Sequence, residues 1–173
     1  MKKLLMTLVL SLALAAPSLA ADAPKVGYVN LQRVLLESND GKVAKQTISE
    51  KIKTVEAQVK ERQQALKTLK ADLEKQAPLL AEDARREKER GYNQQVGELE
   101  SFTQSARKDL QQQDADFTRR ILKDTVEVVQ QLGKEGKYTL ILERNEGALL
   151  YADDGIDLTD KVIELYNAKT KKK

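Results

Sequence analysis

Glycine and lysine alternate closely in the stretch GKEGK, from Gly133 to Lys137, and this spacing invites comparison with a phosphate-binding loop. Such a loop follows a strand, places more residues between its glycines and carries a hydroxyl directly after its lysine. GKEGK instead follows an apolar helical repeat and precedes an apolar strand pattern. The stretch therefore predicts the end of a helix and not a nucleotide site.

The stretch DDGID, from Asp153 to Asp157, carries three carboxylates in five residues and resembles part of a calcium loop. It lacks the alternating ligand positions and the distal glutamate that such a loop requires. A turn at Asp153 to Gly155, followed by a helix that Asp157 or Thr159 caps, explains these residues.

Other catalytic chemistry finds little support in the composition. The sequence has no His and no Cys, which removes imidazole catalysis, thiol chemistry and most metal sites. Carboxylates are abundant, but acid–base catalysis needs a desolvated pocket that shifts a pKa, and exposed helical positions provide none. We predict no catalytic residue, no metal site and no cofactor.

The first 20 residues, MKKLLMTLVLSLALAAPSLA, have the form of a secretory signal peptide. Lys2 and Lys3 precede an apolar run that is too short for a membrane span, and Ser18 and Ala20 are the small residues expected before cleavage. We therefore expect an exported protein cleaved after Ala20, and the resemblance described below implies a periplasmic location. The mature chain keeps 28 basic and 27 acidic residues, because the leader removes two of the 30 Lys and Arg, so no nucleic-acid footprint is expected.

The middle of the chain carries two heptad seams of apolar residues among charges of mixed sign. Their main members are Ile48, Ile52, Val55, Val59, Leu66, Leu69, Leu73 and Leu80, then Tyr92, Val96, Leu99, Phe102, Thr103, Ala106, Leu110, Phe117, Ile121, Val128 and Leu132. The pattern predicts one antiparallel helical hairpin over residues 41–133, with its tip near 76–84. An ordinary bundle would need more covering helices than the short ones at 31–37 and 158–168. Arg62, Gln76 and Gln113 interrupt the seam, which predicts a flexible coiled coil.

The two chain ends carry strand patterns. Lys25 to Asn30 reads as one strand, and residues 138–142 and 147–152 read as a β-hairpin around a polar loop. A break is expected at Asn39–Gly41. The expected fold is α+β, with a small β-sheet or barrel body from residues 21–40 and 134–168, a long helical arm, and a disordered basic tail at 169–173. So small a sheet favours closure between copies of the chain. The expected oligomerisation residues are Tyr28, Leu140, Leu142 and Leu149.

This layout resembles the Skp/OmpH-like family of periplasmic chaperones. The resemblance is carried by KVGYVNLQRVLLES at the start of the body, the charged helical hairpin, and YTLILERNEGALLYADDGIDLTDKVIELYN after it. It implies a trimer whose β-barrel body holds three helical arms around a cavity for unfolded outer-membrane β-barrel proteins, without nucleotide. The arm departs from the strongly basic pattern of the best-known member, since residues 40–130 hold 18 basic and 17 acidic side chains. We also expect at most weak contact with a membrane surface.

The largest apolar side chains near the tip or beside the seam are the expected client contacts: Leu79, Leu80, Tyr92 and Phe102. The alternative for Tyr92 and Phe102 is that they complete the helix–helix core, and Leu79 and Leu80 can simply staple the turn. The rival function is a periplasmic coiled-coil adaptor that docks one folded envelope partner.

Overall fold

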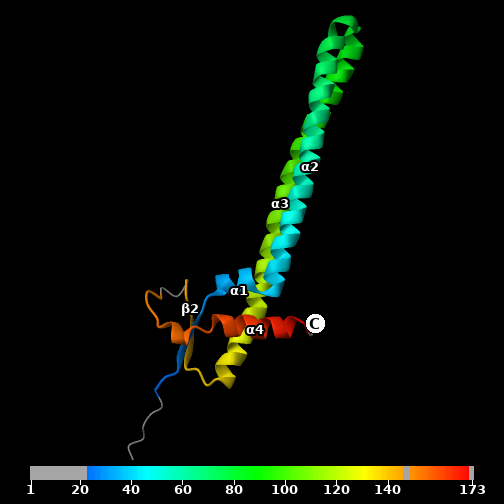
Figure 1. The fold of residues 1–173 in the computed structure, drawn as a ribbon. Helices are drawn as coiled ribbons and strands as arrows, with labels where there is room; N and C mark the ends of the chain where they lie inside the picture. Colours follow the sequence, from blue (N-terminus) through cyan, green and yellow to red (C-terminus); the bar gives the residue numbers. More distant parts are fainter. Residues whose placement is uncertain (1–22, 146–148, 172–173) are drawn as a thin grey trace, which may run out of the picture.

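Two long antiparallel helices dominate the molecule. The structure is a computed structural model, which describes residues 23–145 and 149–171. Helix α2 (Asn39–Gln76) leads away from a small body and helix α3 (Glu82–Glu135) returns to it, so that they form an extended arm (Figure 1). At 1.5 Å per residue, α2 is about 57 Å long. The helical hairpin predicted from the two seams is confirmed.

The chain reverses at the tip through the short 3-10 helix η1 (Ala77–Leu79), which contains Pro78. Proline lacks the amide donor that the next helical hydrogen bond would need, which suits the end of α2. Helix α3 begins with Glu82 and Asp83 in its first turn, where carboxylates interact favourably with the helix dipole.

A tight junction joins helix α1 (Leu31–Glu37) to the base of α2. Ser38 adopts an extended conformation between the two helices, and its hydroxyl accepts a hydrogen bond from the Gly41 amide at 3.1 Å. A Cβ on Gly41 would lie 1.8 Å from the Leu35 carbonyl oxygen, so only glycine fits there. The predicted break at Asn39–Gly41 is therefore wrong by one residue, because Ser38 caps α2 and the next three residues are helical.

The sheet pairs the two ends of the described chain. Strand β1 (Val26–Val29) lies parallel to β2 (Leu140–Glu143), with Val26 opposite Leu140 and Val29 opposite Glu143. On its other side β1 forms a single parallel bridge between Tyr28 and Asp157, which follows the 3-10 helix η2 (Asp154–Ile156). Strand β1 is thus the central element of the body.

The predicted β-hairpin of 138–142 with 147–152 is wrong. Residues 149–152 form no strand, and 146–148 lie outside the described residues. The ladder of β2 runs to β1 instead, since the amides of Thr139 and Arg144 donate to the carbonyls of Lys25 and Val29. The following chain then crosses to the far side of β1, where the Leu158 amide donates to the Tyr28 carbonyl at 2.8 Å.

The body core is formed by helix packing against this sheet. Helix α4 (Thr159–Thr170) and the last turns of α3 enclose α1, so the returning helix continues past the base of the hairpin into the body (Figure 1). The buried core residues are Val29, Val34, Ile121, Val128, Val162 and Tyr166. The Tyr166 hydroxyl donates to Asp40 at 2.9 Å and so joins α4 to the first turn of the arm.

Two chain-end predictions have different outcomes. The GKEGK stretch ends α3 as predicted, with Gly136 as the C-cap and Lys137 in the left-handed region at a φ of 53°. The predicted disorder from residue 169 is wrong for the described part of the tail, because Lys169 lies within α4 and its ammonium contacts Glu127 at 2.6 Å. This ion pair fastens the last turn of α4 to α3.

Candidate functional site

The arm buries little of its own seam. Between Ala44 and Ile121, Leu66 is the single buried hydrophobic residue, and Ile52 keeps 38 % of its surface exposed. The remaining seam residues are half-buried, because two helices alone cannot cover an apolar stripe from every side. The arm therefore presents partly exposed apolar surface along its length.

One edge of the arm, which we term the bridged edge, is held by side-chain contacts between the helices. Lys51 of α2 forms an ion pair with Asp109 of α3, and the guanidinium carbon of Arg62 lies 4.5 Å from the Phe102 ring centroid. Phe102 and Asp109 are seven residues apart, which places them on the same side of α3. Lys88, two further seven-residue steps along this row, donates to Gln76 at 2.8 Å.

The three polar residues that interrupt the seam all have partners. Arg62 stacks on Phe102, Gln76 accepts from Lys88, and the Gln113 amide donates to Asp109 at 3.1 Å. Hydrogen bonds from Lys51 and Gln113 lower the pKa of Asp109, with burial opposing them. The interruptions are therefore specific polar contacts, and the flexibility expected from them stays a prediction.

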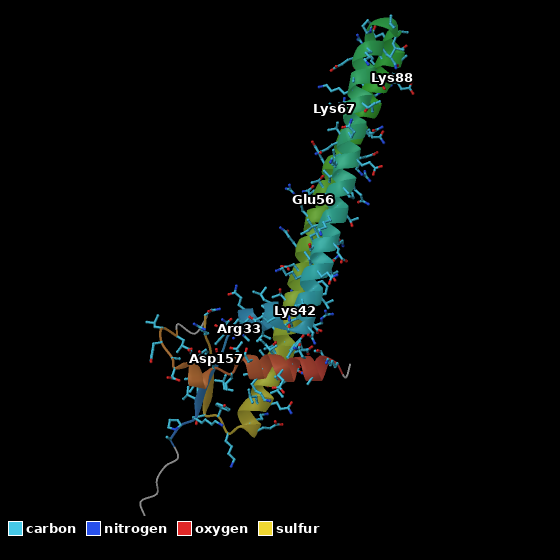
Figure 2. The ribbon with its side chains drawn as sticks, in the orientation of Figure 1. Arg33, Lys42, Glu56, Lys67, Lys88 and Asp157 are labelled. Atoms are coloured by element: carbon cyan, nitrogen blue, oxygen red, sulfur yellow. The ribbon has the colours of Figure 1, made fainter. Side chains whose placement is uncertain are left out.

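The opposite edge, which we term the open edge, is grooved. A narrower part of about 340 Å³ lies between α2 and α3, and a wider part of about 610 Å³ continues along α3. Thr103, Arg107 and Gln63 line both parts, so the groove is continuous. Its remaining lining residues are Ile52, Val55, Glu56, Val59, Lys60, Leu99, Glu100, Gln104, Lys108, Leu110 and Gln111. Glu56 lies midway along the arm, between the body and the tip (Figure 2).

The expected client-contact residues fall into two kinds of place. Leu79, at the tip, is 86 % exposed and touches little of the rest of the chain, while Leu80 beside it is half-buried. Tyr92 and Phe102 are half-buried in α3, and Arg62 covers one side of the Phe102 ring. Leu79 is thus the most accessible of the four, and the proposed contact of all four with clients stays a prediction.

The expected oligomerisation residues are similarly divided. Leu140 is 49 % exposed on β2, and Leu142 and Leu149 are half-buried. Tyr28 is 3 % exposed, so its side chain is covered by its own chain and offers almost no surface to another.

Two residues beyond β2 form a more exposed apolar surface than any expected oligomerisation residue. Leu150 is 98 % exposed and Tyr151 is 85 % exposed. The sequence signal was the apolar run from Ala148 to Ala152, but its assignment to a β-hairpin implied that half of these side chains would be covered. Adjacent large apolar side chains that are exposed to this degree are typical of an interface.

A polar network holds the sheet and the start of α4 in place. The Thr159 hydroxyl accepts from the Asn30 amide at 2.9 Å and donates to Asp157, whose carboxylate also accepts from the Thr159 amide. Burial acts to raise the pKa of Asp157, but hydrogen bonds from Thr159 and Tyr28 outweigh it and lower that pKa. The ionised Asp157 thus accepts from the first amide of α4, but the N-cap position is Leu158, so the sequence-based expectation that Asp157 or Thr159 is the cap is wrong.

The described residues show neither a metal-binding cluster nor a membrane-spanning helix. Across 23–145 and 149–171, no group of three or more acidic side chains is placed to hold a metal ion. In the same segments, none of the helices combines the length and apolar character required to cross a membrane.

Comparison with known proteins agrees with this architecture. Residues 25–166 match the family model described as outer membrane protein (OmpH-like). A crystal structure of a candidate outer membrane chaperone (OmpH-like) from Caulobacter crescentus has the same fold, with a TM-score of 0.78 at 20% sequence identity, covering 85% of this chain and 86% of that one. No curated protein sequence shows significant similarity to the chain. The family match spans most of the chain, from the strand that opens the body to the helix that closes it, and the chain belongs to the OmpH-like family.

Proposed function

We propose that the protein is an ATP-independent periplasmic holdase that encloses unfolded outer-membrane β-barrel proteins between its arms and prevents their aggregation. Membership of the OmpH-like family supports a chaperone role. The observation that carries the proposal is the arm itself, whose apolar seam stays half-exposed over residues 45–120 apart from Leu66. A β-barrel precursor exposes lipid-facing residues that only its membrane can cover, so weak apolar contacts along an arm suit such a client.

We further propose that the working form is a homo-oligomer, with three copies as the family resemblance implies. Leu140, Leu150 and Tyr151 are exposed in the single chain, and among the described residues β2 pairs with β1 alone. Joining copies through these residues would cover apolar surface and place several arms around one space. The same arrangement would leave the arms free to contact a client.

The direct test dilutes a urea-denatured outer-membrane β-barrel protein into buffer with and without the purified mature protein, in the absence of nucleotide. Light scattering and sedimentation then report whether the barrel stays soluble. We expect aggregation to be suppressed at about one oligomer per client. No suppression for several different barrels, together with saturable binding to one folded envelope protein, would favour the adaptor function instead.

A further inference from the structure

The two edges of the arm differ in a way that assigns them different roles. The bridged edge is closed by the contacts of Lys51 with Asp109 and of Arg62 with Phe102. The open edge is a groove, and within the described residues no side-chain hydrogen bond, ion pair or cation–π contact joins its lining residues on α2 to those on α3. Arg107 on the groove and Phe102 on the bridged edge are five residues apart, which separates them by about 140° around α3.

The groove combines an apolar floor with a charged rim. Ile52, Val59 and Leu110 line its narrower part, and Ile52 is 38 % exposed. The basic side chains on the groove are Lys60, Arg107 and Lys108, and the acidic ones are Glu56 and Glu100. Among the described residues, none of these five side chains forms an ion pair within 4.0 Å.

Arg107 has the central place in this groove, because it lines both the narrower and the wider part. The planar guanidinium of an arginine carries five N–H donors in a fixed arrangement that matches the two oxygens of a carboxylate. Because Arg107 forms no ion pair among the described residues, its donors can bind a carboxylate of a ligand. The rim therefore complements a ligand that carries both apolar groups and a carboxylate.

The length of the groove matches a short extended peptide. Its α2 lining runs from Ile52 to Gln63, about 16 Å along the helix axis. An extended strand rises about 3.3 Å per residue, so about five residues span this distance. In a strand of that length, alternate side chains point to one face, where they can enter the groove, while the others stay in water.

We infer that the open edge is the client-holding edge of the arm, and that it binds an extended client segment with alternating apolar side chains whose acidic residues pair with Arg107. This inference rests on the proposed holdase function and adds to it the edge, the segment chemistry and the central residue. The bridged edge then keeps the helices together while the open edge is occupied. In an oligomer, the arms then turn their open edges toward the enclosed client.

Neighbouring residues at the same height of the arm provide a matched crosslinking test. Gln104 lines the groove and is exposed, whereas Ser105 is equally exposed but lies on the side of α3 that carries Phe102 and Asp109. A photoreactive benzoylphenylalanine replaces each residue in turn in the full mature protein. A urea-denatured eight-stranded outer-membrane barrel protein is the client. We expect crosslinks to the barrel from position 104 at least about fivefold above those from position 105.

A charge variant tests the role of Arg107. Arg107→Gln should weaken retention of the barrel about two- to fivefold, the range for an exposed ion pair. Arg119→Gln is the control, since Arg119 is exposed on the arm and lies outside the groove. A designed peptide in which leucine and glutamate alternate should reduce crosslinking of the barrel to position 104. A peptide in which leucine and lysine alternate should reduce this crosslinking at least about twofold less.

The outcomes separate this inference from the proposed function. If the barrel stays soluble but crosslinks equally from positions 104 and 105, or mainly from 105, the edge assignment is wrong and the holdase function stands. If position 104 crosslinks to another copy of the chain with and without client, the groove is an interface between arms and the inference fails. If neither position crosslinks and the barrel aggregates, the holdase function itself is refuted.

Discussion

Leu150 provides the sharpest test of how copies of the chain associate. Its side chain is 98 % exposed, so it contributes almost nothing to the stability of a single chain. Complete burial of a leucine side chain against another copy contributes about 1.5–3 kcal/mol. Leu150→Ser should therefore weaken association roughly ten- to hundredfold for each subunit.

The matched control for this change is Leu79→Ser. Leu79 is 86 % exposed but lies at the tip of the arm, far from the body (Figure 1). The two variants lose the same apolar group from nearly the same degree of exposure. Leu79→Ser should leave the oligomer intact, and both variants should keep wild-type helicity and monomer stability within about 0.5 kcal/mol.

Sedimentation velocity over a dilution series measures the effect directly. The wild type should remain associated at concentrations at which Leu150→Ser has dissociated into folded monomers, recognised by unchanged circular dichroism. If Leu150→Ser dissociates at the same concentration as the wild type, Leu150 is not buried between copies. The exposed surface after β2 would then have no part in assembly, whatever holds the copies together.

Three further substitutions test the junction and the arm. Gly41→Ala would place a Cβ 1.8 Å from the Leu35 carbonyl oxygen, so we expect a loss of about 1–3 kcal/mol and a lower urea midpoint. Tyr166→Phe removes the hydrogen bond to Asp40 and should cost about 1–2 kcal/mol in urea unfolding at pH 7. Burial and this hydrogen bond raise the pKa of Tyr166, so the wild type should lose stability as the pH rises above about 10, where the unfolded tyrosine ionises, and Tyr166→Phe should lose less over that range. Phe102→Ser should preserve helicity and oligomer size and, because Phe102 lies on the bridged edge, should leave barrel retention unchanged within about 0.5 kcal/mol, and a larger loss would show that this ring also contacts clients.

The helices were predictable because their signal is local and repeated. Apolar steps of three and four residues persist over most of α2 and α3, and each step adds independent support for the same geometry. The junction at Ser38 was harder to predict. The sequence Asn39–Asp40–Gly41 has the composition of a turn, but Gly41 is required by the close approach of the Leu35 carbonyl. That requirement depends on how α1 packs on α2, which no local pattern records.

The strand pairing was not predictable for a related reason. Alternation identified the residues of β1 and β2 as extended, but it does not specify the neighbour to which a strand bonds. Val26 pairs with Leu140 across more than a hundred residues, a separation that no local pattern spans. The nearer segment at 147–152 was the simpler choice on sequence distance alone. Its two most exposed residues, Leu150 and Tyr151, were missed because a strand in a hairpin would have covered part of them.

The body and the arm differ in how much apolar surface each of them buries. The body is closed by its first strand, its last helix and fully buried side chains such as Val34, Val162 and Tyr166. The arm between Ala44 and Ile121 has Leu66 as its single buried hydrophobic residue and depends on separate contacts along one edge. Deforming an arm with so little buried core costs little free energy. Covering its partly exposed apolar surface is energetically favourable. Under the proposed holdase function, a client held there would stabilise the arm while the arm shields the client, and neither contact would need nucleotide hydrolysis.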